Sequence, residues 1–261
     1  MTCHSRTALT RVLLSVAMVA TAIAVTARTP AAASQGLLSC MRWQAVHVTG
    51  SNDQPYVVRN KPSINDNDRG MCLSASGGPA GFTVIRSPGQ AKSPTVRAYP
   101  YIGTGCFEGA CAPAHPDAPP RAGSLGNYTV SWATTTPPDS GKWDSSLDLW
   151  LGPRTGDGAD EVMIWLRYSG PQWWVGQYPT VWIDGAKWYE VPHSTPPDRY
   201  YISFRRATPA TAATLRLAPF MAAAERAGQV KPSALLWAVQ AGFEIWSGGS
   251  GLAVTRFSIN K

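Results

Sequence analysis

The sequence of 261 residues has no apolar run long enough to cross a membrane as a helix, which needs about 20 residues. Its main apolar stretch, residues 12–25, lies near a start that carries Arg6 and Arg11 and no acid. The small residues up to Ala33 suit a signal peptidase. We therefore expect residues 1–33 to be an export signal cleaved after Ala33, which leaves a secreted protein with no membrane segment.

A lipid anchor is the alternative to simple export. The segment LLSC, which ends at Cys40, loosely resembles a lipobox. Arg28 and Pro30 separate it from the apolar stretch, and Leu38 fits the motif poorly. We therefore favour export without an anchor.

Clusters of basic residues are also lacking. The net charge of +7 falls to +4 without residues 1–33, because that stretch carries three arginines and no acid. The remaining basic residues are scattered, apart from the neighbours Arg205 and Arg206. Since nucleic-acid binding needs a basic patch or stripe, we expect no nucleic-acid partner.

The ligand spacing of a metal site is missing. Four residues between Cys106 and Cys111 are an unusual gap for a zinc knuckle, and the segment 66–70 lacks two of the oxygen ligands of a calcium loop. We interpret that segment as a turn. The histidines of the expected mature chain do not cluster near the cysteines: they are His47, His115 and His193. We therefore expect no metal and no cofactor.

The cysteines indicate disulfides instead. Cys3 leaves with the export signal, and an even number in an exported chain predicts two bridges with three possible connectivities. One connectivity closes a short loop with the last two cysteines and ties the N-terminal region to a later strand with the first two. The four cysteines are Cys40, Cys72, Cys106 and Cys111.

Helix-forming segments are scarce. Residues 218–228 predict a helix, because Ala and Glu favour one and Gly228 is placed to end it. Elsewhere, runs rich in Val, Ile, Tyr, Trp and Thr alternate with Gly, Pro, Asn and Asp, which predicts strands joined by turns. We expect strands at 43–49, 81–87, 95–102, 128–134, 146–151, 161–168, 180–184, 187–191, 199–205, 234–245 and 251–258.

This pattern predicts an all-β sandwich with one short helix. No internal repeat is visible, and strands resume directly after the Pro-rich segment 112–124, so we interpret that segment as a surface connection. The stretch 34–261 suits one β-rich domain or two small ones by its length. We expect a single domain and a monomer.

Two of the predicted strands carry an acid beside tryptophan. Period-two alternation places Glu161, Met163 and Trp165 on one face of the first strand, opposite an apolar face. In the second strand, Glu244 and Trp246 share a face. Paired carboxylates are what cleavage of a glycosidic bond requires, whereas single acids are also common on solvated strand faces. The pattern alone leaves both interpretations open.

Longer segments resemble glycoside hydrolase family 12, the small jelly-roll endoglucanases. EVMIWL (161–166) and AGFEIWSGGSGLAVTRFS (241–258) carry the resemblance most clearly. VRAYPYIGTGC, YTVSWATTT, GKWDSSLDLWL and VWIDGAKWYEV extend it from about residue 40 to the end. It implies a β-jelly-roll of two antiparallel sheets, concanavalin-like, with an open substrate cleft and a paired-cysteine loop.

The resemblance also implies a retaining endo-β-1,4-glucanase. Glu161 matches the family's nucleophile, Glu244 its general acid/base, and Asp148 the acid that hydrogen-bonds the nucleophile. Such a pair lies about 5–5.5 Å apart. A xyloglucan- or mixed-linkage-glucan hydrolase is the alternative within the family. A non-catalytic glucan-binding protein is a further alternative, but it has no need to keep these three acids.

Eleven tryptophans suit a cleft in which sugar rings stack on aromatic faces. Trp43 matches a sugar-binding residue of the family, although it could equally pack in the core. Trp173 and Trp174 stand where the family generally has Gln-Pro. Our candidate substrate-binding residues are Trp43, Asn60, Met163, Trp165, Trp174 and Trp246. In the core we expect Trp132, Trp150, Trp182 and Trp188.

Two departures from the family fall on sugar-binding elements. Ser63 stands where the family usually has a tryptophan that stacks on a sugar, after Lys61 and Pro62. In the short cysteine loop, Phe107 and Glu108 stand where the family often has His and Trp. These changes alter substrate binding and leave the expected carboxylates in place.

Overall fold

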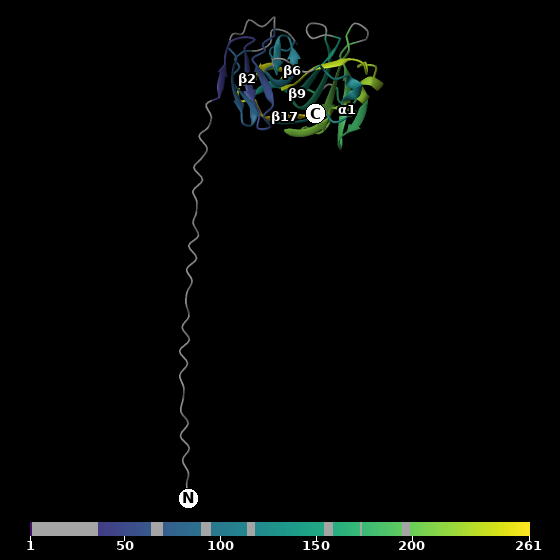
Figure 1. Cartoon of the computed structure of the whole chain (residues 1–261). Helices are drawn as coiled ribbons and strands as arrows, with labels where there is room; N and C mark the ends of the chain where they lie inside the picture. The colour runs from purple at the N-terminus through teal and green to yellow at the C-terminus, as the bar shows by residue number, and fades with distance from the viewer. Residues whose placement is uncertain are drawn as a thin grey trace. The chain divides into compact units, whose positions relative to one another are not determined.

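Two β-sheets enclose a hydrophobic core (Figure 1). The smaller sheet contributes Leu73, Phe82 and Trp132, and the larger contributes Ile164 and Phe204, all at most 2% exposed. The predicted sandwich is therefore confirmed. The computed structural model describes residues 1, 36–63, 70–89, 95–113, 118–153, 159–172, 174–194 and 199–261.

The smaller sheet has six strands within the described residues and contains both the first and the last strand of the described chain. Its first and last strands in the chain lie three positions apart, with two strands between them. In order across the sheet, the strands are β1 (Leu37–Ser39), β4 (Cys72–Gly77), β5 (Ala80–Arg86), β17 (Ala253–Asn260), β8 (Thr129–Thr135) and β14 (Ala212–Arg216).

The larger sheet has eleven strands in the part of the chain described. Its order is β11 (Thr180–Ile183), β12 (Ala186–Pro192), β13 (Tyr201–Arg206), β10 (Asp160–Ser169), β9 (Gly141–Gly152), β15 (Leu235–Gly242), β6 (Tyr101–Phe107), β3 (Pro55–Arg59) and β2 (Ala45–Thr49). In addition, β16 (Ile245–Gly248) pairs with β9 and β7 (Ala110–Ala112) with β6. The strands β10 and β13 pair in parallel. The chain between them forms the β11–β12 hairpin.

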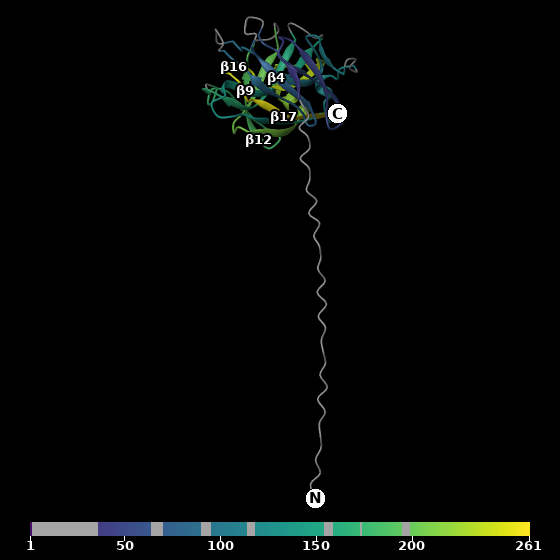
Figure 2. The ribbon, with the colours of Figure 1, turned by 90° about the vertical axis from the view of Figure 1, so that its left-hand side faces the viewer.

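The predicted helix is confirmed as α1 (Leu217–Arg226), with a short 3-10 turn η1 (Ala122–Ser124) near it. Phe220 and Met221 bury its inner face in the core. Gly228 has φ of 69° and its N–H donates to Glu225, so the glycine ends the helix as expected. Figures 1 and 2 show the fold from two directions, with α1 in Figure 1 on the opposite side from β2.

Most predicted strands are confirmed within a few residues of their ends. The predicted strand 95–102 is mostly wrong, because β6 begins only at Tyr101, and the stretch 234–245 divides into two strands at Phe243 and Glu244. The short strands β1 and β7 escaped prediction because three residues show no alternation. Three further strands were missed: β3, β4 and β14.

Both disulfides suggested by the sequence are present. Cys40 bonds to Cys72, which ties the chain before β2 to β4. Cys106 bonds to Cys111 and closes the β6–β7 hairpin. The second bridge fixes a turn beside the cleft described below.

The four tryptophans that were expected in the core do not all lie there. Trp132 and Trp188 are fully buried in the core, as expected. The prediction for Trp182 is wrong: it is 72% exposed, because it lies on the edge strand β11 with its side chain opposite the core residue Ile183. Trp150 is buried but outside the main core, where it stacks on Phe107 at a centroid distance of 3.9 Å.

The remaining expectations concern segments outside these strands. The export signal with cleavage after Ala33, most of the segment 66–70, and Trp173 lie outside the described residues. Within the described part, no helix is long and apolar enough to span a membrane.

Candidate active site

The middle strands of the larger sheet bring the expected acids to one face. Alternate residues of β10 enter the core, so Glu161 and Met163 point to the other side. On β9, Trp150 lies opposite Glu161, and Asp148 lies opposite Met163. The face predicted from alternation is therefore the face that carries the acids.

Glu244 reaches the same face from the link between β15 and β16. Its neighbours Phe243 and Ile245 are fully buried in the core, which turns Glu244 the opposite way, as expected. The N–H of Asp144 on β9 donates to the carbonyl of Glu244 at 3.0 Å. This bond fixes the link against β9, next to the strand that carries Glu161.

Two adjoining cavities over this face form one cleft. Their volumes are about 460 and 500 Å³. Glu161 and Asp148 line the first cavity, while Glu244 and Tyr201 line both, so the cavities meet at Glu244. The acids thus lie in the middle of an open groove with room on either side.

Cations surround Glu161. The side chain is 8% exposed, and Arg199 Nη2 lies 2.5 Å from its Oε2. Burial raises the pKa of Glu161 to about 7, and the charges of Arg199 and Lys61 act in the opposite direction. The two cations thus favour the ionised carboxylate that a nucleophile needs, against the effect of burial.

Carboxyl groups surround Glu244. Burial raises its pKa well above the ordinary value, and the charge of Asp144, a hydrogen bond to Asp144 and the charge of Glu161 act in the same direction. Arg205 opposes the shift. Because Glu244 holds its proton while Glu161 is paired with a cation, the two acids are suited to different tasks.

Asp148 is 2% exposed beneath the two acids. Burial raises its pKa well above the ordinary value, and the charges of Glu161 and Glu244 add to the effect. A hydrogen bond from Tyr99 acts against it. A carboxyl held neutral in this way is a hydrogen-bond donor for its neighbours.

Four of the candidate substrate-binding residues line the cleft. Trp43 lines the first cavity and has φ of 63°, which turns it out of the strand that follows. Trp165, Trp174 and Trp246 line the second cavity, where their rings meet edge to face around Trp165. Aromatic surfaces are thus present on both sides of the acids.

Two candidates lie elsewhere. Asn60 is 2% exposed and its amide donates to the carbonyls of Ser39 and Met71, so it fastens neighbouring segments and lines neither cavity. Met163 has no exposed surface, and its sulfur accepts a hydrogen bond from Tyr201 at 3.0 Å. It supports a residue of the cleft wall and does not line the cleft.

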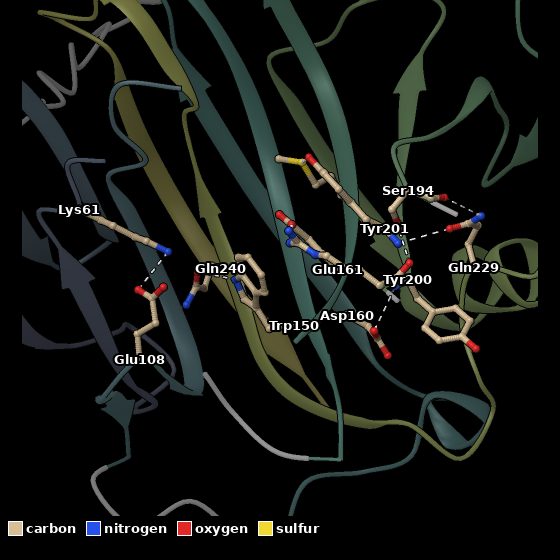
Figure 3. A network of polar contacts seen from close by, with 12 residues as sticks. Lys61, Glu108, Trp150, Asp160, Glu161, Ser194, Tyr200, Tyr201, Gln229 and Gln240 are labelled. Carbon is tan, nitrogen blue, oxygen red and sulfur yellow. Dashed lines mark hydrogen bonds and ion pairs between the residues drawn. The ribbon is translucent and has the colours of Figure 1, made fainter. Parts of the chain in front are cut away.

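The departures from the family meet at one end of the cleft. Lys61 Nζ lies 3.1 Å from a carboxylate oxygen of Glu108 (Figure 3). The same atom lies 4.9 Å from the centroid of the Phe107 ring. Trp150 lies in the same group and donates to Gln240 at 2.9 Å. A charged pair thus lies at this end of the cleft, and both of its residues line the first cavity together with Ser63.

A buried guanidinium supports the other end. Arg205 is 2% exposed, and its guanidinium carbon lies 3.9 Å from the ring centroid of Trp165 and 4.2 Å from that of Trp174. It also donates to Ser203, and its Nη2 lies 3.2 Å from the ring nitrogen of His193. Cation–π contacts of this kind hold both indole rings in place.

Sequence reasoning missed four residues of the site, although alternation could have found them. In the predicted strand 199–205, every second residue is polar or aromatic, opposite the core residues Ile202 and Phe204. Asp144 shares the face of Asp148, four positions away on β9. The residues missed are Asp144, Arg199, Tyr201 and Arg205.

A jelly-roll with two differently tuned carboxyls in an aromatic groove is a glycoside hydrolase by fold and site. Residues 124–260 match the sequence pattern of Glycosyl hydrolase family 12. With this match over half of the chain, the protein belongs to glycosyl hydrolase family 12. A search of curated protein sequences gave no match.

Solved structures agree with this assignment. The endoglucanase Cel12A from Rhodothermus marinus is 32% identical with a TM-score of 0.73, over 86% of this chain and 98% of the other. A metagenome-derived family 12 endoglucanase is 31% identical with a TM-score of 0.74, over 86% and 96%. The endo-1,4-β-glucanase CelB2 is 26% identical with a TM-score of 0.74, over 85% and 98%.

Proposed function

We propose that the protein is a secreted endo-β-1,4-glucanase that hydrolyses cellulose-type chains with retention of anomeric configuration. The observation that carries this proposal is the contrast between Glu161, paired with Arg199, and Glu244, hydrogen-bonded to Asp144. The similar solved structures described as endoglucanases support the choice of substrate.

The first step forms a covalent glycosyl-enzyme. A carboxylate oxygen of Glu161 attacks the anomeric carbon while the glycosidic C–O bond breaks, and Glu244 protonates the departing oxygen. The second step reverses these roles. Glu244 takes a proton from water, the water oxygen attacks the anomeric carbon, and Glu161 leaves as a carboxylate.

Asp148 acts on Glu161 in this proposal. Because its pKa is raised, it stays protonated and is available to donate a hydrogen bond to the nucleophile once substrate is bound. Such a bond fixes the orientation of Glu161. As the negative charge of Glu161 disappears in the first step, the strength of the bond falls, so Asp148 also helps the carboxylate to leave in the second.

The aromatic side chains bind the sugar rings. Trp43 offers a face on one side of the acids, and Trp165, Trp174 and Trp246 line the other. Because Ser63 stands where the family usually has a stacking tryptophan, the test compares plain cellulose chains with xyloglucan and mixed-linkage glucan.

Reducing-sugar release from carboxymethylcellulose, xyloglucan and lichenan tests the function. We expect Glu161→Gln and Glu244→Gln to lower the rate by about 100-fold or more, and Glu225→Gln on α1 to leave it unchanged. If the wild-type protein releases no reducing sugar from any of the three glucans, the proposal that it is a glucanase is wrong. Near wild-type rates in either cleft variant would refute the assigned roles.

The stereochemistry has its own test. Proton NMR of the first products from a cello-oligosaccharide should show the β-anomer before mutarotation. An initial α-anomer would show inversion and exclude Glu161 as a covalent nucleophile.

A further inference from the structure

Arg199 is the closest cation to the proposed nucleophile. Its Nη2 lies 2.5 Å from Oε2 of Glu161, and the two side chains are 40% and 8% exposed. Arg199 also lines the first cavity of the cleft. The ion pair therefore lies at the edge of the space that substrate enters.

The backbone of Arg199 is held from several directions. Ser194 Oγ donates to the carbonyl of Arg199 at 2.7 Å. The next residue, Tyr200, donates its N–H to Asp160 at 3.2 Å and accepts the N–H of Glu161 at 2.8 Å (Figure 3). The strand that carries the nucleophile thus also fixes the residue after Arg199.

Gln229 ties the same segment to the end of α1. Its Oε1 accepts the N–H of Tyr201 at 3.3 Å, and its Nε2 donates to the carbonyl of Ser194 at 3.5 Å. Figure 3 shows Gln229 bridging Ser194 and Tyr201. Because Gln229 is buried, the bridge belongs to the folded frame.

The side chain of Arg199 is placed as well. Its guanidinium carbon lies 4.9 Å from the ring centroid of Tyr201, and the hydroxyl of Tyr201 donates to Met163 under the cleft. A long arginine side chain normally loses considerable entropy when it is fixed. Here the surrounding contacts hold it in position before substrate arrives.

Other charges also face Glu161. Lys61 approaches from the end of β3 and lowers its pKa, as Arg199 does. The carboxyls of Asp148 and Glu244 lie on the neighbouring elements and interact with Glu161 electrostatically. Arg199 is the cation in direct contact with the carboxylate among the described residues.

We propose that Arg199 is a positioning residue that stabilises the free carboxylate of Glu161, which keeps the nucleophile ionised and favours its departure from the glycosyl-enzyme. This inference rests on the proposed role of Glu161. The guanidinium interacts most strongly with the full charge that Glu161 carries before the first step and regains after the second. In between, the covalent ester has lost that charge.

Two consequences distinguish this role from a structural one. Without the positive charge, Glu161 is protonated at higher pH, so the acidic limb of kcat/KM moves upward. In addition, the ionised Glu161 becomes a better nucleophile and a poorer leaving group. The covalent intermediate then forms faster and breaks down more slowly, so a larger share of the enzyme is held as this intermediate at steady state.

The variant Arg199→Met tests both consequences with 2,4-dinitrophenyl β-cellobioside. We expect the acidic limb of kcat/KM to move up by about one pH unit. This is the low end of the pKa shift that a contacting arginine causes in a carboxyl group, because Arg199 is partly exposed. Acid-quenched mass spectrometry should show more glycosyl-enzyme than in wild type. Arg199→Lys keeps the positive charge and should give an acidic limb between those of the wild type and of Arg199→Met.

Arg216→Met is the matched control, because Arg216 also pairs with a carboxylate, at 2.7 Å from Asp184, but neither residue lines either cavity of the cleft. It should leave the pH profile unchanged. An unmoved acidic limb in folded Arg199→Met, or an equal shift in the control, overturns the proposal. If Glu161→Gln remains active, the proposed nucleophile itself is wrong, which is a separate outcome.

Discussion

Asp144 and Glu244 are joined twice: the N–H of Asp144 donates to the carbonyl of Glu244 at 3.0 Å, and their carboxyl groups share a hydrogen bond. The interaction raises the pKa of Glu244 and lowers that of Asp144, which favours the proton on Glu244. Burial still raises the pKa of Asp144 to about 7. The pair therefore keeps a proton on the proposed acid.

The variant Asp144→Asn should lower the pKa of Glu244. It removes a negative charge beside Glu244 and offers an amide that can donate to the ionised form. Carbon-13 NMR of labelled glutamate carboxyls, followed through a pH titration, measures the change. Asp139→Asn, on an exposed turn, is the control and should have no effect. An unchanged or higher pKa in Asp144→Asn would contradict the shared hydrogen bond.

The variant Asp148→Asn should raise the melting temperature at pH 8 and lower activity. Folding raises the pKa of Asp148, so this carboxyl lowers the free energy of unfolding at pH values above its unfolded pKa, which is near 4. The loss of stability grows as the pH rises from that value. The stabilising effect should therefore be small at pH 4 and larger at pH 8. Each kcal/mol corresponds to about 2–4 °C for a domain of this size. Calorimetry at both pH values measures the difference, and an equal effect at the two would contradict the raised pKa.

Local patterns predicted the sandwich and the faces of the two acidic strands because alternation is a property of each strand alone. Val162 and Ile164 had to enter a core, so Glu161 had to face away from it. The same argument placed Glu244 opposite Phe243. The family resemblance supplied the distinct roles of these acids, which alternation cannot assign.

Other features depend on contacts between distant segments. Trp182 was expected in the core by its residue type, but only the strand order shows that β11 is an edge. Asn60 was expected in the cleft, but its partners Ser39 and Met71 lie in separate segments. Arg199 meets Glu161 because β13 inserts beside β10 in parallel, a pairing that no local pattern specifies.

The two disulfides should differ in their effect on stability. The bridge Cys40–Cys72 spans 32 positions and Cys106–Cys111 spans 5. Loop-closure entropy predicts about 4 kcal/mol for the first and about 2 kcal/mol for the second. Replacing both cysteines of the first pair by serine should therefore lower the melting temperature more. Equal losses in thermal unfolding would contradict the entropic argument.

The variant Ser63→Trp should bind cello-oligosaccharides more tightly. Ser63 lines the first cavity together with Trp43, and its N–H donates to the carbonyl of Arg97 at 2.6 Å, which fixes the backbone at this point. A new indole there would add a stacking surface for one sugar ring, worth about 0.5–1.5 kcal/mol if it resembles other aromatic contacts. Calorimetric titration in the inactive Glu161→Gln background measures the affinity without turnover. The matched variant Ser63→Leu adds apolar volume without an aromatic face and should give a smaller gain. If the two variants bind equally, or if neither differs from the parent, the predicted stacking at position 63 is wrong.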